Sequence, residues 1–531
     1  MKHWMIGSVA AAALLAACGG GSDGGDEVAV TETQVGGGEV RLPGLTLRSG
    51  DAGEAADALA ALSLVDGSPG RIGFGSQTTD GANATFNDVT ITVPDEDHGE
   101  VPINAASLEL VGLEMTDAGP SFSQMTLNGI SVTPPDGEDA EVNVGSVQLT
   151  NPSPELAAWV SSLMGEGEPA DFPDAANVSF DGFSLANLTA RGGDEDGGGE
   201  FAIGSIDLRG MGPEKLQAVV LEGLSLNARD EGEDMDIVFS LGSVSLAGAN
   251  TSVLAGLQDV ESEEEFAAAI AQATAQNPLD PGYDNATVEN FSMDVGGVTI
   301  DMPSMDIAVT RNSDGQATAS SMRPFTMTIG ADPNKPAGSQ LAGPLQQMGF
   351  DELVITSASD ATIDPDTDRL ETNGYAELAD GFKLGFDYDV NGFGSFIQAA
   401  NSPEVQEAAV TDPTAFLDAV SSLALNDMEI VFEDQSILEK GFQLAGAMMG
   451  EDPESLKGQA QLGVGFLPLM GAQAGIDAEI LTELSGALSS FLADPGTLTL
   501  KLDPESPVTA DTFADPSQIT KASLGFSASA E

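Results

Sequence analysis

The chain has 531 residues, of which 85 are Asp or Glu and only 17 are Lys or Arg, giving a formal net charge of −68 at pH 7. This excess of acid excludes electrostatic binding to nucleic acid, because phosphate contacts need clustered Lys and Arg. The single Cys excludes a disulfide framework, an iron–sulfur cluster and a Cys-rich zinc site, while a hydrophobic fraction of 41% predicts a sizeable folded core.

The N-terminus has the pattern of a bacterial secretion signal. Lys2 precedes an apolar run, Met5 to Ala17, that is too short for a permanent membrane-spanning helix. The run ends in Leu15-Ala16-Ala17-Cys18, which resembles the lipobox of bacterial lipoprotein precursors. This resemblance covers residues 1–18 and implies cleavage before Cys18. It also implies that diacylglycerol and an acyl chain such as palmitate are attached to this Cys.

The residue after Cys18 bears on the location that this resemblance implies. In enterobacterial lipoproteins an Asp at that place retains the protein in the inner membrane, whereas here the residue is Gly19. We therefore expect a protein of a Gram-negative bacterium that is lipid-anchored in the cell outer membrane and faces the periplasm. Residues 19–38 are rich in Gly, Ser and acids, which predicts a flexible tether.

The rest of the chain contains an internal repeat. Five similar β-like segments share a Ser, at Ser107, Ser146, Ser205, Ser243 and Ser304. Short spacings alternate with long ones, and each long gap holds a helix-like insert, over 154–164 and 262–276. Regular spacing of this kind is typical of stacked units that cannot bury their apolar faces alone.

Within the repeats, the alternation of apolar residues slips by one position. Apolar residues 201 and 203 share one parity, and residues 206 and 208 share the other, on either side of Gly204. Strand side chains alternate with a period of two, so a gap of three predicts either a β-bulge or a switch of the buried face. The same slip surrounds Gly145 and Gly242. We therefore predict a sheet that bends along a line through these Gly residues.

These patterns predict a mainly β fold with some α: an elongated, curled antiparallel β-meander built from repeated bulged hairpins, with helical inserts and an α-rich C-terminal region. Separate β-sandwich domains are the alternative. The predicted organisation is a signal peptide (1–18), the tether (19–38), a short helix and strand region (39–84), the β-hairpin repeats (85–330), a continuing β region (331–400) and an α-rich C-terminal cap (401–531).

The last 180 or so residues are predicted in more detail from local patterns. Strands are expected at 353–364, 369–378, 381–390, 427–433 and 497–502, and helices at 413–425, 437–449 and 478–493. The apolar stretch 460–476 comes closest to a membrane span, but Pro468 and several Gly break it. We predict a packed helix and loop there.

Histidine chemistry is nearly absent, because His3 belongs to the signal peptide and His98 lies in an acidic turn. This excludes a Ser-His-Asp or Cys-His catalytic set and a three-His zinc site. Carboxylate pairs suited to hydrolysis are expected by chance among 85 acids, so they indicate little. We expect no enzymatic activity, with a carboxylate-based hydrolase of envelope polymers as an alternative.

Calcium is the one metal that the sequence suggests. Asp364, Asp366 and Asp368 match the first three ligand positions of an EF-hand loop, but Arg369 replaces the required Gly and Tyr375 replaces the final Glu. The alternating residues on both sides favour a hairpin turn instead. Weak divalent-cation binding by such acidic loops remains an expectation, and no cofactor is expected.

The long β-repeat, mainly over residues 85–330, resembles the AsmA and TamB group of envelope proteins, whose β-groove is thought to carry lipid between membranes. That group is anchored by an N-terminal transmembrane helix instead of a lipid. Our leading hypothesis is a non-enzymatic, acidic outer-membrane lipoprotein that acts as an envelope scaffold or a binding module. The resemblance implies the alternative, a carrier of lipid or of another hydrophobic ligand. The membrane is the expected partner in either case.

Overall fold

The computed structural model describes residues 42–65, 71–95, 99–132, 141–165, 170–194, 197–213, 215–230, 235–251, 280–400, 421–473, 476–509 and 519–531, with a few single residues between them. Cys18, the predicted signal peptide and tether, and His98 lie outside the described residues. The helix predicted over 262–276 and most of the helix predicted over 413–425 also lie outside them.

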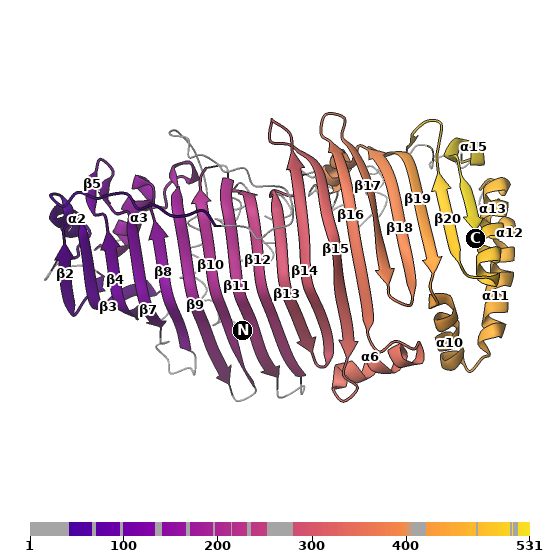
Figure 1. Ribbon diagram of the computed structural model, residues 1–531, viewed down its shortest axis with the longest axis horizontal. Helices are drawn as coiled ribbons and strands as arrows, with labels where there is room; N and C mark the ends of the chain where they lie inside the picture. The colour runs from indigo at the N-terminus through magenta and orange to yellow at the C-terminus, as the bar shows by residue number, and fades with distance from the viewer. Residues whose placement is uncertain are drawn as a thin grey trace. The chain divides into compact units, whose positions relative to one another are not determined.

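The fold is mainly β with helices in the C-terminal region, and its strands form an antiparallel meander, as predicted (Figure 1). The chain divides into two compact units. The first unit comprises residues 1–273 and 282–290, and the second comprises residues 274–281 and 291–531. Strand β13 (Asn285–Val295) contributes residues to both.

In the first unit, each long strand pairs with the next one along the chain. These strands are β3 (Asn83–Asp95), β4 (Gly99–Val111), β7 (Gln124–Val132), β8 (Glu141–Thr150), β9 (Phe180–Asp194), β10 (Gly197–Met211), β11 (Lys215–Asp230) and β12 (Met235–Asn250). Two short strands, β1 (Ile72–Gly73) and β2 (Ser76–Asp80), pair with the remaining edge of β3. A small hairpin, β5 (Glu114–Thr116) with β6 (Gly119–Ser121), lies between β4 and β7 in the chain.

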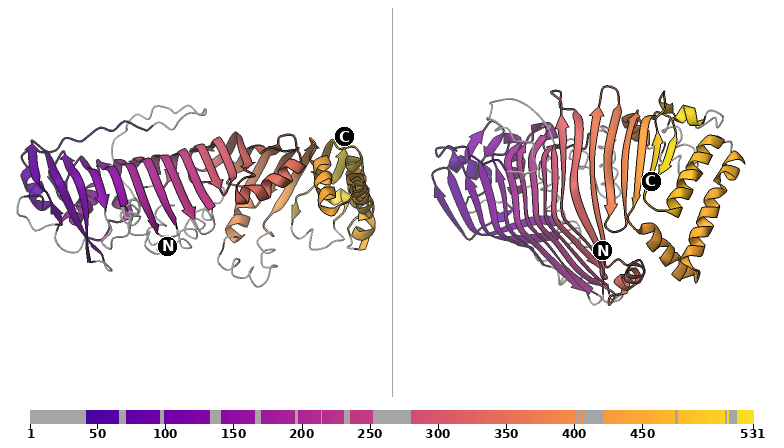
Figure 2. Two further views of the ribbon diagram at one scale, coloured as in Figure 1. Left: turned by 90° about the horizontal axis from the view of Figure 1, so that it is seen from below. Right: turned by 45° about the vertical axis from the view of Figure 1, so that its right-hand side comes forward.

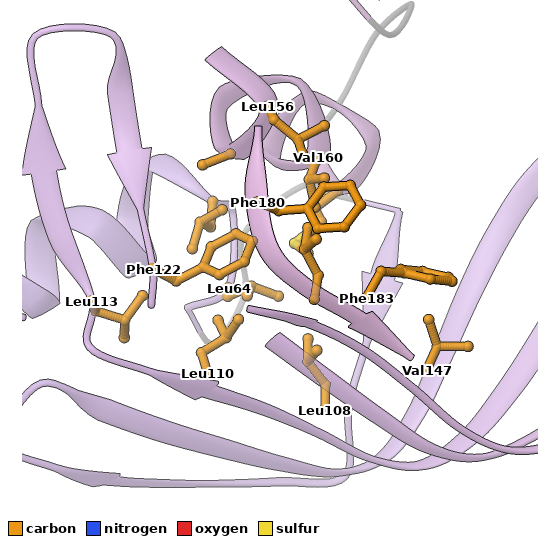
Figure 3. Packing of buried hydrophobic residues seen from close by; sticks show 14 of the residues in the cluster. Leu64, Leu108, Leu110, Leu113, Phe122, Val147, Leu156, Val160, Phe180 and Phe183 are labelled. Carbon is orange, nitrogen blue, oxygen red and sulfur yellow. The ribbon is translucent and has the colours of Figure 1, made fainter. Parts of the chain in front are cut away.

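One face of this sheet carries a sealed hydrophobic core. Helix α3 (Pro154–Met164) has the predicted bounds of the first insert, and it begins where the Ser153 side chain caps the backbone N–H of Leu156. Leu156 and Val160 of this helix pack with Phe180 and Phe122 (Figure 3). The helix α2 (Ala55–Ala61) contributes Ala and Leu side chains to the same core.

The slip in the apolar alternation corresponds to one irregular position in each long strand from β3 to β13, that is, in all of them except the small hairpin β5–β6. On alternate strands a residue with positive φ, between 53° and 66°, occupies this position: Asp88, Gly129, Asn187, Gly223 and Asn290. The strands between them place Ala106, Gly145, Gly204 and Gly242 opposite these residues, and the regular pairing from β3 to β12 skips these positions. Gly242 also lies beside Asn290. We call this set of residues the break line. The magenta strands bend part-way along their length (Figure 2).

The break line keeps the apolar side chains on one face, which decides between the two predicted explanations of the slip. On β9, Leu185 and Leu188 are both buried in the same core cluster although three positions separate them. On β10, Ile203 and Ile206 pack against that cluster from either side of Gly204. The slip is therefore a bulge-like irregularity and not a switch of the buried face.

The Gly residues of the break line have two different roles on neighbouring strands. Gly204 itself has an ordinary φ, and the positive φ belongs to Gly223 on the next strand. At Gly204 a side chain is excluded by space, because an added Cβ would lie 3.0 Å from the carbonyl oxygen of Glu222. The strand with Gly204 thus needs a residue without a side chain, and the neighbouring strand with Gly223 needs a residue that adopts a positive φ.

In the second unit, consecutive strands pair from β14 to β20. They are β14 (Val298–Arg311), β15 (Ala317–Ala331), β16 (Leu353–Asp364), β17 (Arg369–Leu378), β18 (Phe382–Asn391), β19 (Ala424–Asp434) and β20 (Thr497–Leu502). Strand β21 (Val508–Thr509) pairs with β19, and β22 (Ser527–Ala530) pairs with β20. The predicted strands 353–364, 369–378 and 497–502 are confirmed with their bounds.

The helices of the second unit include two that the sequence analysis did not predict. Helices α6 (Pro336–Gln347) and α7 (Phe393–Ala400) interrupt the region 331–400, which was predicted to continue as β. Helix α6 is rich in Pro and Gly, and it is fixed by tertiary packing of Leu345 in one buried cluster with Leu378. Beyond residue 436 the chain forms α10 (Ile437–Met449), α11 (Pro453–Gly465), α12 (Leu467–Gln473), α13 (Ala478–Ala493) and α15 (Lys521–Leu524). The bounds predicted for α10 and α13 are confirmed.

We predict that Gly223→Ala destabilises the first unit by about 1–2 kcal/mol, because an L-residue with a side chain is strained at positive φ. Its added Cβ would meet only ordinary contacts, so the loss reports on the backbone conformation. Gly486→Ala in α13, where the added Cβ meets nothing, is the control and should stabilise its helix by up to about 1 kcal/mol. Urea denaturation of both variants measures these changes, and a neutral Gly223→Ala would contradict the break line.

Candidate functional site

The second unit carries large apolar side chains on one face of its sheet, on both sides of a middle formed by small residues. Residues that lie directly opposite each other in an antiparallel sheet point to the same face. One such row consists of Ile307, Met322, Ser359, Gly374, Phe386, Ile430 and Leu500. The adjacent row consists of Phe325, Ser357, Ala376, Leu384 and Phe432. We call the side chains of these two rows the open face.

Three buried clusters border the open face: two lie at the ends of its strands, and a third, which contains Phe491 of α13 and Leu498, packs against Phe432 and Leu500 on β19 and β20. Leu370 at the start of β17 belongs to one cluster, with Ile363 and Phe393 of α7. Leu378 at the end of β17 belongs to the other, with Leu345 of α6 and Phe350. At about 3.3 Å per residue, these two Leu residues bound a strip roughly 26 Å long.

Between these clusters, the large apolar side chains of the open face are only half-buried. This holds for Ile307, Met322, Phe325, Phe386 and Ile430, each of which is partly exposed to solvent. The corresponding face of the first unit contains fully buried side chains, such as Phe86 and Leu108. The apolar face is therefore sealed around these residues, whereas the large side chains of the open face are half-buried, as are those of β11 and β12 in the first unit, such as Leu226 and Phe239.

Small residues on β16 and β17 shape the middle of the open face. Gly374 is the most constrained of them, because an added Cβ would lie 2.7 Å from the Phe386 ring and 3.0 Å from Cβ of Ser359. The Phe386 ring therefore leans over Gly374. Ser357 donates a hydrogen bond of 3.0 Å to the carbonyl oxygen of Tyr375, so its hydroxyl is turned to the backbone.

The opposite face of the same strands is polar and contains a shallow hollow of about 500 Å³ lined by Asp364, Thr367, Arg369, Asp389, Asn391 and Asn426. Arg369 donates two hydrogen bonds to Asp389, from Nε at 2.9 Å and from Nη2 at 2.6 Å. Asn426 donates a third to Asp389 at 2.9 Å. These donors, Arg369 first, hold the pKa of the Asp389 carboxyl below its ordinary value.

Asp427 lies directly opposite Asp389 on the neighbouring strand. Partial burial, together with the negative charges of Asp389 and Asp387, raises the pKa of Asp427. Asp389 in the hollow is therefore stabilised by its cation, whereas Asp427 on the neighbouring strand is destabilised by its surroundings. Because Asp389 is held ionised, it is poorly suited to donate a proton in general acid catalysis.

The calcium candidates Asp364, Asp366 and Asp368 lie at a hairpin turn between β16 and β17. A hairpin turn was the favoured interpretation of this stretch. Asp364 accepts hydrogen bonds from the backbone N–H of Asp366 and the hydroxyl of Thr367. Asp368 points elsewhere and accepts bonds from the backbone N–H groups of Gly394 and Ser395 at the start of α7. Within the residues that the structure describes, no group of three or more His, Cys, Asp or Glu side chains is arranged to hold a metal ion.

Comparison with known proteins gives one partial match. A protein-family model described as "Uncharacterized protein" matches residues 375–531, which run from β17 through the C-terminal helices. A search of the curated proteins gives no match. No helix among the described residues is long and apolar enough to cross a membrane.

Substitution of the two facing carboxylates should change stability in opposite directions. Asp389→Asn removes the bidentate partner of Arg369 and should lower the Tm at pH 7. The pKa of Asp389 is lowered in the folded protein, so its stabilising contribution is present above the ordinary carboxyl pKa of about 4 and is lost as the pH falls through the lowered value.

Asp427→Asn should raise the Tm at pH 7, because ionisation of a carboxyl with a raised pKa opposes folding. This gain should disappear as the pH falls through the raised pKa and Asp427 becomes protonated. Thermal unfolding of both variants between pH 7 and pH 3 measures the two effects. Changes of the same sign at neutral pH would contradict the assigned environments.

Proposed function

We propose that the protein is a non-enzymatic, lipid-anchored protein of the bacterial envelope whose second unit binds the acyl chains of a lipid along the open face. The observation that carries this proposal is the half-exposure of Ile307, Met322, Phe325, Phe386 and Ile430 on one face of the sheet. Monomeric soluble proteins rarely expose large contiguous apolar patches, and those that do use them for binding. The proposal develops the carrier hypothesis drawn from the sequence.

The dimensions of the open face suit an acyl chain. The strip between the two buried clusters at the strand ends is roughly 26 Å long, whereas one leaflet of a bilayer holds its acyl chains within about 15 Å. Each CH₂ group removed from water contributes about 0.8 kcal/mol, so partial coverage of one chain gives appreciable affinity. Met322, whose side chain is unbranched, adapts to a flexible ligand better than branched side chains do.

The chemistry of the open face matches a ligand recognised by shape and hydrophobicity. Its hydroxyl groups are few, and Ser357 already donates to the backbone. The charged side chains of the same strands, such as Arg369 and Asp389, line the hollow on the opposite face. A lipid tail requires no polar partner, whereas a peptide or a sugar would leave its hydrogen-bonding groups unpaired.

Substitution on the open face tests the lipid-binding proposal. Met322→Gln introduces an amide among apolar side chains and should reduce the amount of lipid that co-purifies several-fold, as measured by native mass spectrometry of detergent-free protein. Arg323→Gln is the matched control, since Arg323 is the next residue and is exposed. Absence of bound lipid in the parent protein, or equal loss in both variants, would contradict the proposal.

The anchor is tested separately at Cys18. When the gene is expressed in a Gram-negative host that is fed labelled palmitate, the parent protein should incorporate the label and fractionate with the outer membrane. Cys18→Ser should abolish the labelling, because it removes the only thiol in the chain. Labelling that survives this substitution would exclude the proposed anchor, but it would leave the lipid-binding face untouched.

A further inference from the structure

The C-terminal helices of the second unit expose an unusual concentration of large apolar side chains. Of the exposed large hydrophobic residues among the described part of the chain, most lie between positions 448 and 476: Met448, Met449, Leu462, Phe466, Leu469 and Ile476. Helix α11 has no buried residue, in contrast to α13, which buries Ile480, Leu481 and Phe491. An apolar helix surface that packs on nothing is a candidate for docking.

Three of these residues form the centre of the surface. Leu462, Phe466 and Leu469 are 67%, 56% and 62% exposed. Leu462 lies on α11, Leu469 lies on α12, and Phe466 lies at the turn between the two helices. We call these three side chains the helical patch.

The charge of the surrounding segment points to the partner. Residues 458–476 contain no Asp, Glu, Lys or Arg, although the chain as a whole has a net charge of −68. The carboxylates elsewhere are strongly hydrated and are repelled by the anionic lipids of a membrane. The neutral helical patch is therefore a part of this chain that a lipid surface accepts without an electrostatic penalty.

The cations nearest to the patch in the sequence are engaged within the second unit. Lys457 donates to the carbonyl oxygen of Ala493 at the end of α13. Lys440 donates to the carbonyl oxygen of Asp380, and its ammonium group lies 3.6 Å from the centre of the Phe350 ring. Neither is arranged as part of a cationic rim for an acidic protein partner.

The composition of the segment also favours a bilayer over another protein. Stable protein interfaces concentrate Tyr, Trp and Arg and provide about one hydrogen bond per 100–200 Å². Residues 458–476 contain one aromatic residue, Phe466, and the remainder consists mostly of Gly, Ala and aliphatic residues. Small residues between a few large apolar side chains suit shallow insertion among lipid tails, which requires no shape-matched pocket.

We infer that the helical patch is a membrane-contact surface that inserts Leu462, Phe466 and Leu469 into the interfacial region of a lipid bilayer. This contact is independent of an anchor at Cys18 and of ligand binding on the open face. It goes beyond the proposed function because it gives the second unit a direct, peripheral contact with the membrane.

Vesicle flotation tests this inference on residues 19–531, so that neither the apolar run Met5 to Ala17 nor an acyl anchor at Cys18 contributes. The protein should float with phosphatidylcholine vesicles, and added anionic lipid should weaken its binding, since the net charge is −68. The triple substitution Leu462→Ser, Phe466→Ser, Leu469→Ser should reduce the partition coefficient at least about tenfold, because each 1.4 kcal/mol of lost burial is tenfold.

The matched control replaces three exposed apolar residues of the first unit, as Leu47→Ser, Met115→Ser, Val238→Ser, and should leave flotation unchanged. Exposed substitutions change stability little, and equal melting temperatures would confirm that both triple variants fold. A parent protein that does not float, an equal loss in both triple variants, or binding that rises with anionic lipid overturns the inference. So does a parent dimer that the patch substitutions convert to a monomer without affecting flotation.

A second variant probes depth directly. Phe466→Trp should shift its emission to shorter wavelengths when phosphatidylcholine vesicles are added, and brominated acyl chains should quench it. An unchanged spectrum overturns the inference. Lipid co-purification, which tests the open face, is measured without vesicles, so the failure of one proposal is distinguishable from the failure of the other.

Discussion

The first unit depends on a conformational constraint that recurs at one position in each of its long strands. Every second strand places a residue in the left-handed region, and the strand beside it places a small residue opposite. Without this arrangement, strands as long as β12, with 16 residues, would have to turn half of their apolar side chains to solvent after the slip in alternation. The break line keeps those side chains on one face, and the sealed core follows from it.

The distribution of roles along the break line also explains its sequence. Gly129 and Gly223 satisfy the positive φ directly, while Asn187, Asn290 and Asp88 are among the few other residue types that enter this region readily. Gly204 and Gly242 serve a different need, because a Cβ there would press on the facing strand. The same residue type thus appears for two physical reasons on neighbouring strands.

The second unit uses a similar meander with a different outcome. Two of its buried clusters lie at the ends of the strands and another lies under α13, while the face between them stays half-buried on β14, β15 and β18. Burial of apolar area is the main favourable term in folding, so leaving this much of it accessible has a cost in stability that sealing would avoid. A binding function for the open face explains why this cost in stability is tolerated. On the opposite face, Arg369, one of the few cations of this acidic chain, forms an ion pair with Asp389.

The sequence by itself determined the repetitive β architecture, the slip at Gly145, Gly204 and Gly242, and the bounds of α3, α10 and α13. All of these depend on local periodicity and on capping or turn residues. It did not determine that the slip keeps one buried face, because that depends on which strands pair and in which register. Nor did it predict α6, whose Pro and Gly content disfavours a helix until Leu345 packs beside Leu378.

Only the tertiary structure separated a sealed core from an open face. Large apolar residues share one face in both units, with Ser, Gly and Ala among them on β16 and β17, so the pattern specifies which side chains share a face but not what covers them. The sequence also does not show which partners the acids of the turn contact. Asp364 and Asp368 are close in sequence, but they form hydrogen bonds with different partners. Whether an apolar face is accessible to solvent, and whether side chains come together at one site, depends on contacts between distant segments. Those contacts form only when the chain is folded.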